Sequence, residues 1–180
     1  MKHTLRFVAF LLTTLSCSAY ALDVDTYRSL ANNTIRQMNM GVVGDIDAMI
    51  AAQEELMVVG IEGGVSYLQS NPQGGTPLQL TILNAEGMKS LTLDQIETLW
   101  HGGEFLKSKG IDPDKIDHFG PMMSLMDAVI HPATAYLLLK EYKISGNTDL
   151  LARVKAELLE VLEHVNHVEP SHNVQLSSSE

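Results

Sequence analysis

The amino-acid sequence predicts an all-α, single-domain bundle of five to seven helices around a central apolar helix that is kinked at a proline. Apolar residues recur at steps of three and four along most of the chain, as one face of an α-helix requires. The segment from Gly120 to Tyr142 is apolar on nearly every side, which is typical of a helix that other helices surround. No internal repeat or long linker divides the sequence, so one helical domain is expected over residues 22–170.

The first 21 residues have the layout of a secretory signal peptide. Lys2 and Arg6 form a positive start, residues 7–15 form an apolar run too short to span a bilayer, and the Ala-Tyr-Ala of residues 19–21 suits a cleavage site. This segment is therefore left out of the fold, and export to a bacterial periplasm is expected. The alternatives are an uncleaved anchor, which the short apolar run disfavours, and a lipoprotein, for which the Leu expected before Cys17 is missing.

N-caps and apolar stripes predict two helices after the signal peptide. Asp23 is a suitable N-cap for the first helix, and Asp45 is a suitable N-cap for the second. Gly63 and Gly64 interrupt the second stripe, and residues 71–75 form a turn. The first stripe consists of Val24, Tyr27, Ala31, Ile35 and Met38, and the second of Ile46, Met49, Ile50, Gln53, Met57 and Gly60.

Residues 78–83 fit either a helix or a strand. Their alternation of apolar and polar side chains is strand-like. Thr76 and Gln79, however, have the spacing of a capping box with Pro77 at the first helical position, which favours a short helix to Glu86. A lone strand would also lack a partner, so the helix is preferred.

The clearest helix start in the chain is at Thr92, which forms a capping box with Gln95. The predicted helix continues through Leu106 and ends before Gly110. Asp112–Pro113 then begins another short turn.

The central apolar helix follows, and Pro132 is expected to kink or split it near His131. The proline also lacks the backbone donor that would bond to the carbonyl of Ala128. That carbonyl is therefore free for water, a side chain or a ligand.

The last helix is predicted to start at a cap on Asn147 or Thr148 and to end before Pro170. Residues 171–180 are expected to form a disordered tail. The apolar stripe of this helix consists of Leu151, Val154, Leu158, Val161, Leu162, Val165 and Val168.

Composition limits the classes of function. The 180 residues are 45% hydrophobic and 19% charged, which excludes disordered chains and multi-spanning membrane proteins. The formal net charge of −10 gives no electrostatic attraction to DNA or RNA, so no nucleic-acid partner is expected. Cys17 is the only cysteine, so signal cleavage leaves a chain without a disulfide, a thiolate nucleophile or covalent c-type haem. The cleaved chain is also expected to have no stable membrane anchor.

Four histidines follow a carboxylate by four residues on a predicted helix, which places both groups on one face. The ordinary explanation for such pairs in an acidic helical protein is a surface charge match. Helical phase puts His164 at the edge of the last stripe and His167 opposite it, so both are expected in solvent, where they would bind only an adventitious metal. The pairs are Glu97/His101, Asp127/His131, Glu160/His164 and Glu163/His167.

Two segments are candidates for a ligand-binding site. Asp127 and His131 lie on the central helix, where an unpaired charge would be costly. The other segment has two adjacent glycines, Gly102 and Gly103, inside a well-capped helix. Each glycine destabilises a helix by roughly 1 kcal/mol relative to alanine, and close packing, a local break or a ligand would offset this cost. The ordinary explanations are a hydrogen-bonded structural histidine and close helix packing. The candidate residues are Trp100, His101, Glu104, Asp127 and His131, which Asp117 and His118 would join in one polar cluster.

No nucleophile lies in a known catalytic motif, so no catalytic residue, metal ligand or cofactor is assigned. The expected function is that of an exported, non-enzymatic helical domain that binds a small molecule or another periplasmic protein at the kink. One alternative is a bundle that holds a metal ion, or non-covalent haem between Met38 or Met40 and His164. A second alternative is a hydrolase-like enzyme with His131 or His101 as general base.

Overall fold

The computed structural model describes residues 22–39, 44–73 and 75–168. The expected signal peptide, Met40, Pro170 and the expected tail lie outside these residues. The described part of the chain is helical and contains no strand, which confirms the all-α fold class. Its elements are α1 (Val24–Asn39), α2 (Ile46–Ser70), α3 (Thr76–Met88), α4 (Leu93–Ile96), the π-helix η1 (Glu97–His101), α5 (Glu104–Ser108), the 3₁₀-helix η2 (Pro113–Lys115), α6 (Pro121–Ser145) and α7 (Asp149–Val165).

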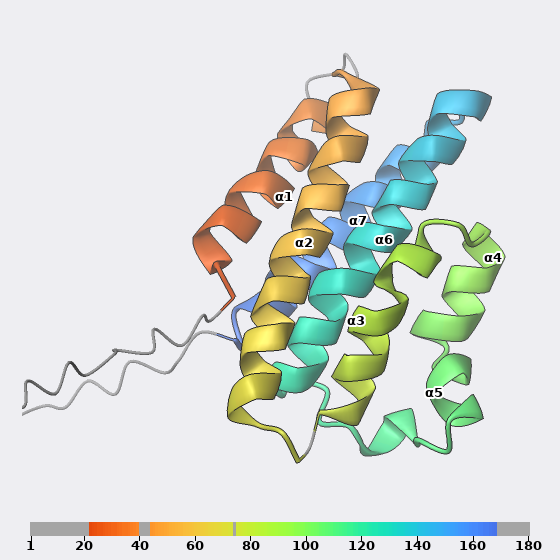
Figure 1. Ribbon diagram of the computed structural model, residues 1–180. Coiled ribbons are helices and arrows are strands. Elements are labelled where there is room, and N and C mark those ends of the chain that lie inside the picture. The colour runs from red at the N-terminus through yellow and green to blue at the C-terminus, as the bar shows by residue number, and fades with distance from the viewer. Residues whose placement is uncertain (1–21, 40–43, 74, 169–180) are drawn as a thin grey trace, which may run out of the picture.

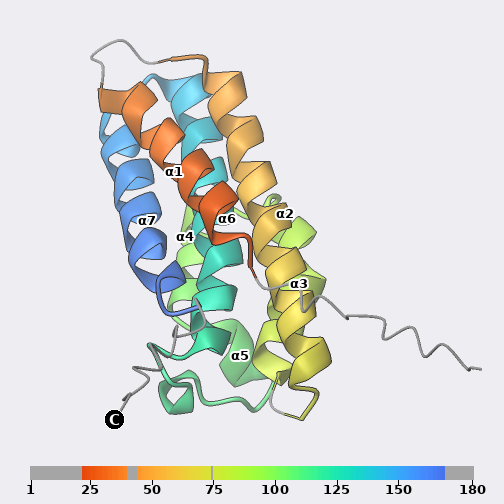
Figure 2. The ribbon, with the colours of Figure 1, turned by 90° about the vertical axis from the view of Figure 1, so that its left-hand side faces the viewer.

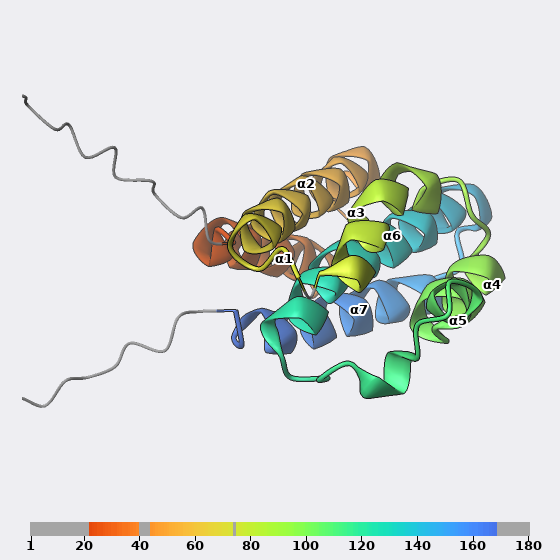
Figure 3. The same ribbon diagram turned by 60° about the horizontal axis from the view of Figure 1, so that its bottom comes forward.

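Helix α6 lies at the centre of the bundle, as its apolar sequence predicts. In Figure 2, α7 lies on one side of α6 and α2 on the other, with α1 crossing in front, and α3 packs against both α2 and α6 (Figure 1). The short segment from α4 to α5 lies beside α6 and α7, as the view from below shows (Figure 3). Helix α6 is long and apolar enough to cross a membrane, but 83% of its most apolar stretch is buried inside the bundle, as expected of a core helix.

Pro132 does not split α6, which continues as one helix from Pro121 to Ser145. The carbonyl of Ala128 that the proline leaves free accepts a hydrogen bond of 3.0 Å from the buried hydroxyl of Tyr27 on α1. Helix α2 approaches the same carbonyl so closely that a Cβ at Gly60 would lie 2.5 Å from its oxygen. The bundle thus satisfies and covers the backbone at the proline turn.

Helix α2 also continues through Gly63 and Gly64, so the expected interruption there is wrong. A Cβ at Gly63 would lie 2.9 Å from Leu22, and one at Gly64 would lie 2.9 Å from Ile82 of α3. These glycines permit close approach of neighbouring segments without ending the helix. The packing explanation therefore accounts for them.

The predicted helix starts agree with the structure at most positions. Asp45 caps α2 by accepting from backbone amides, and Thr92 and Gln95 form the predicted capping box at α4. Residues 78–83 are helical, as preferred. The capping box expected at Thr76 is wrong, because α3 begins at Thr76 itself after Gly75 and has no side-chain cap.

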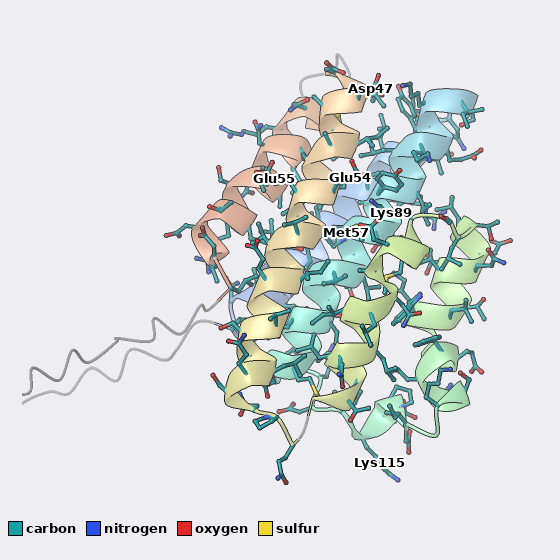
Figure 4. The ribbon with its side chains drawn as sticks, viewed as in Figure 1. Asp47, Glu54, Glu55, Met57, Lys89 and Lys115 are labelled. Carbon is teal, nitrogen blue, oxygen red and sulfur yellow. The ribbon has the colours of Figure 1, made fainter. Side chains whose placement is uncertain are left out.

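An ion pair on the outer surface joins α2 to the end of α3. Lys89 donates to Glu54 at 3.0 Å, and the two labelled side chains lie near each other in Figure 4. Lys89 also contacts Glu86 at 2.8 Å, and these two hydrogen bonds, with Glu86 the larger influence, raise the pKa of the lysine.

Candidate functional site

A cavity of about 410 Å³ opens between α6, α7 and the segment that contains η1 and η2. Its walls are partly apolar, and its polar side chains are mostly imidazoles and carboxylates. It is lined by Trp100, His101, Gly102, Gly103, Leu106, Pro113, Asp114, Ile116, His118, Met123, Met126, Asp127, Ile130, His131, Glu160 and His164.

Helices α6 and α7 form the rigid side of the site. Asp127, His131 and Thr134 are spaced by four and three residues, so they share one face of α6. Glu157 and His164 are seven residues apart, which places them on one face of α7 two turns from each other. The two helices are joined by the short connection after Gly146, whose φ of 67° ends α6. Their polar faces therefore meet inside the bundle.

The other side of the site is a π-helical turn, not the regular helix that the sequence predicts through Leu106. The amide of Gly102 donates to the carbonyl of Glu97 at 2.7 Å, five residues back. Gly103 follows with a φ of 73° and starts α5 in a new direction. The adjacent glycines thus mark a local break, one of the three explanations considered for them. Single π-turns occur frequently at functional sites.

The π-turn places His101 against α6 and α7. Its Nε2 lies 2.9 Å from the hydroxyl of Thr134 and 3.8 Å from Oε2 of Glu157. The Thr134 hydroxyl already donates to the carbonyl of Ile130 at 3.1 Å, so it accepts from Nε2–H of His101. On the other side of Glu157, Nδ1–H of His131 donates to the same Oε2 at 2.7 Å.

His101, His131 and Glu157 are spaced as metal ligands are. One donor atom from each lies within 4.8 Å of the other two. Metal–ligand distances of about 2.0–2.1 Å place tetrahedral ligands about 3.3 Å apart. The two distances to Glu157, 2.7 and 3.8 Å, lie on either side of that value. These three side chains are therefore the ones that could hold a small metal ion, once they adjust to its bond lengths.

Asp127 extends this polar chain toward His164. Its Oδ1 lies 4.0 Å from Nε2 of His131, and its Oδ2 lies 2.6 Å from Nδ1 of His164. The second contact is a short ion pair, so Asp127 is the partner of the buried His164 imidazole. His164 is only 5% exposed. Carboxylates and imidazoles thus alternate across the cavity from Glu157 to His164.

The carboxylates affect the two buried imidazoles in the same direction. Burial lowers the pKa of His131, but the hydrogen bond to Glu157 and the charge of Asp127 outweigh it, so the pKa is raised overall. The pKa of His164 is raised by its contact with Asp127, against a smaller opposing effect of burial. The carboxylates thus shift both imidazoles toward the protonated, ion-paired form.

Four of the five ligand-site residues proposed from the sequence come together in the structure. Trp100, His101, Asp127 and His131 all line the cavity. Trp100 is buried and stacks on Phe105 with ring centroids 4.5 Å apart. Glu104 does not line the cavity, because its carboxylate pairs with Lys107 at 3.0 Å on the surface.

His118 also lines the cavity, although Asp117 does not. The His118 ring lies 5.0 Å from that of His164, edge to face. The Asp117 carboxylate accepts from the amide of Phe119 at 3.2 Å and so organises the loop.

Sequence reasoning missed that Glu157 and His164 lie in this polar cluster. Glu157 has no histidine four residues away on its own helix, so the spacing rule did not select it. His164 was expected in solvent beside Glu160, which is wrong: the side chain is buried and contacts Asp127 of α6. The other local pair fails as well, since Glu97 binds Arg153 at 2.9 Å instead of His101.

Fold and site together define an all-α bundle with a buried histidine–carboxylate cluster at an internal cavity. No family model, curated protein or solved structure matches the chain.

Proposed function

We propose that this chain is an exported, periplasmic protein that binds a divalent transition-metal ion of the zinc class in its helical bundle. His101, His131 and Glu157 are the proposed ligands. The observation that carries the proposal is the convergence of these three donors from three separate elements on one point. This is the metal-binding alternative considered from the sequence, with a different set of ligands.

The chemistry of the donors supports an ion of this class. Two imidazole nitrogens and one carboxylate oxygen suit zinc and its neighbours, whereas calcium and magnesium prefer oxygen ligands alone. Asp127 lies beside Nε2 of His131, the nitrogen opposite the proposed ligand atom. A carboxylate in that place commonly orients a metal-binding histidine.

The proposal is tested by titrating the chelator-treated protein with Zn²⁺ in a calorimeter. We expect tight binding that Glu157→Gln and His131→Ala each weaken by roughly tenfold or more, as the loss of a ligand should. His167→Ala is the matched control, because this exposed histidine is not among the residues that line the cavity. Equal affinity in Glu157→Gln and in the control would refute the proposal, as would the absence of binding in the unaltered chain.

Export is tested separately. The full-length chain, expressed in a bacterium with a periplasm, is expected in the periplasmic fraction with a mass that lacks residues 1–21. A full-length mass in the cytoplasmic fraction would contradict this part of the proposal.

A second candidate function, the binding of a small organic ligand, is favoured by the cavity itself. Three protein ligands leave a coordination position of the metal open, and the volume of about 410 Å³ lies beside it. Trp100 is the only tryptophan and lines the cavity, so its fluorescence reports on occupation. A ligand screen should find compounds that change this fluorescence in the metal-loaded protein, and Met126→Trp, which fills the cavity, should weaken their binding.

A further inference from the structure

We propose that the cavity binds an organic cation, an ammonium group carried on a small apolar group. The apolar group lies against Pro113, Ile116 and Met123 on the wall of the cavity, and the ammonium lies beside Asp114 and Glu160. This proposal rests on the second candidate function, the binding of a small organic ligand, and adds the chemical class of that ligand. No metal ion is needed for it.

The first argument is the apolar surface that the cavity leaves in contact with water. Pro113, Ile116 and Met123 line the cavity, and all three are only half-buried. Covering such surface is favourable, and the volume of about 410 Å³ is within the range of small-molecule sites. The thioether chain of Met123 can also adapt to the shape of what it covers. These walls account for the apolar part of the ligand.

The second argument is the charge of the lining. The residues that line the cavity include the carboxylates of Asp114, Asp127 and Glu160, but no lysine or arginine. Asp127 has a cationic partner, because it is ion-paired with His164 at 2.6 Å. Within the described part of the chain, Asp114 and Glu160 form no ion pair. An organic cation would supply the partner that these two carboxylates lack, whereas an anion would be repelled.

The imidazoles near Glu160 do not replace this partner. Burial lowers the pKa of His131, and Glu157, Asp127 and Glu160 raise it, with Glu160 the weakest of the three carboxylates. The pKa of His164 likewise responds most to Asp127 and less to Glu160. His131 is hydrogen-bonded to Glu157 at 2.7 Å, and His164 is ion-paired with Asp127. Each buried imidazole thus already has a carboxylate of its own.

Three basic side chains near the cavity in sequence bind carboxylates that do not line it. The pairs are Lys107–Glu104 at 3.0 Å, Lys115–Asp112 at 3.4 Å and Arg153–Glu97 at 2.9 Å. The charge of Asp114 reaches Lys107, but the hydrogen bond to Glu104 is the larger influence on the pKa of that lysine. These cations therefore neutralise other carboxylates, and the two at the cavity remain open to a cation from solution.

The exposure of the two carboxylates sets the expected size of the effect. Asp114 and Glu160 are both exposed, so they lie at the mouth of the cavity and keep their contact with water. Ion pairs of exposed carboxylates are weak, and salt weakens them further. The apolar wall is therefore expected to supply most of the affinity, and the charge to decide between ligands of the same shape.

The test compares probes with the same apolar group and different charges: phenethylammonium, phenethyl alcohol and phenylacetate. Each is titrated into the chelator-treated protein, and binding is followed by calorimetry and by the fluorescence of Trp100, which lines the cavity. We expect the ammonium to bind roughly fivefold more tightly than the alcohol at low ionic strength, and the carboxylate to bind most weakly. High salt should reduce the difference between the ammonium and the alcohol.

Variants test the assignment of the two carboxylates. Asp114→Asn and Glu160→Gln should each reduce the preference for the ammonium over the alcohol by roughly half or more, while the affinity for the alcohol stays unchanged. A merely structural role would weaken the binding of every probe. Glu163→Gln is the matched control and should keep the preference, because this exposed glutamate lies one turn after Glu160 on α7 and does not line the cavity.

Equal affinities for the ammonium and the alcohol, or tightest binding of phenylacetate, would overturn the cation and leave the binding of a small organic ligand intact. A preference for the ammonium that persists in both Asp114→Asn and Glu160→Gln would overturn the assigned site. If no probe binds, the second candidate function fails together with this inference. The affinity for Zn²⁺ is measured separately, so none of these results affects the proposed metal site.

Discussion

Tyr27→Phe should destabilise the protein, because the Tyr27 hydroxyl on α1 replaces a hydrogen bond that Pro132 on α6 cannot make. Pro132 cannot donate to the carbonyl of Ala128, and the Tyr27 hydroxyl supplies the missing hydrogen bond at 3.0 Å. Tyr27 and Ala128 are both completely buried, so water cannot replace the hydroxyl in Tyr27→Phe. A buried carbonyl left without a partner costs about 1–3 kcal/mol, and we expect a loss of that size in the free energy of unfolding.

The measurement is urea unfolding of the metal-free protein, followed by circular dichroism. The midpoint should fall while the slope of the transition stays unchanged, because the variant removes one interaction and not a large surface. Ser124→Ala is a suitable comparison. The Ser124 hydroxyl donates to the carbonyl of Gly120, but that carbonyl also accepts from the backbone amide of Ser124, so the variant leaves it with a partner.

A double-mutant cycle tests the cause. Pro132→Ala restores an amide that can donate to the Ala128 carbonyl, as residues four apart do in any helix. In that background Tyr27→Phe should cost less than half of what it costs beside the proline. If Tyr27→Phe costs the same in both backgrounds, or less than about 0.5 kcal/mol in the original chain, the reasoning is wrong.

Three further predictions concern the site and the glycines around it. The pKa values of His131 and His164 are raised in the folded chain, so their protonation stabilises the metal-free fold below the unfolded pKa of about 6.5, and this contribution is lost as the pH rises through the folded pKa values. The melting temperature measured with chelator should therefore fall over this pH range. A rise in melting temperature attributable to these histidines would contradict the prediction. Gly60→Ala places a Cβ 2.5 Å from the Ala128 carbonyl and should cost about 1–3 kcal/mol, whereas Gly87→Ala, in open space on α3, should be neutral or stabilising by urea unfolding. Gly103→Ala should weaken Zn²⁺ binding in calorimetry, because its Cβ would lie 2.7 Å from Pro113. Gly110→Ala is the control: its φ of 76° is similar and it has no neighbour within 4 Å, so it should cost stability without changing Zn²⁺ affinity. Equal Zn²⁺ affinities of the two variants would contradict the prediction.

Local signals were enough to find the helices because a helix is defined by contacts between near neighbours. Caps at Asp45 and Thr92 need only the next three residues, and both are confirmed. The effect of Gly63 and Gly64 could not be predicted in this way. Whether a glycine ends a helix or lets another segment approach depends on what packs against it, and Leu22 and Ile82 are distant in sequence.

The same limit explains what was found and missed at the site. Trp100 and His101 were selected because two glycines broke a local rule, and Asp127 and His131 because they lie on an apolar helix. Glu157 breaks no local rule, since a glutamate outside the apolar stripe of an amphipathic helix is ordinary. Its partner His131 is 26 residues earlier and becomes its neighbour only when α6 and α7 pack.

Pro132 and the π-turn of η1 have different consequences for the site. The carbonyl that the proline frees is hydrogen-bonded by Tyr27 of α1 and covered by Gly60 of α2, so the bundle satisfies the irregularity of α6. His131 therefore projects from a well-packed helix, and its side chain is only 5% exposed. This rigid placement would suit a ligand of the proposed metal ion, because the ligand would already have its geometry.

His101 has the opposite setting. It ends a π-turn between two helices of only four and five residues, and its side chain is 24% exposed. Its Nε2 bonds to Thr134, a contact that the proposed metal binding would replace. In the proposed metal site, His131 and Glu157 would thus be the preformed part, and His101 would complete it. For this reason Gly103→Ala, which disturbs the segment carrying His101, should reduce metal affinity more than it reduces the stability of the bundle.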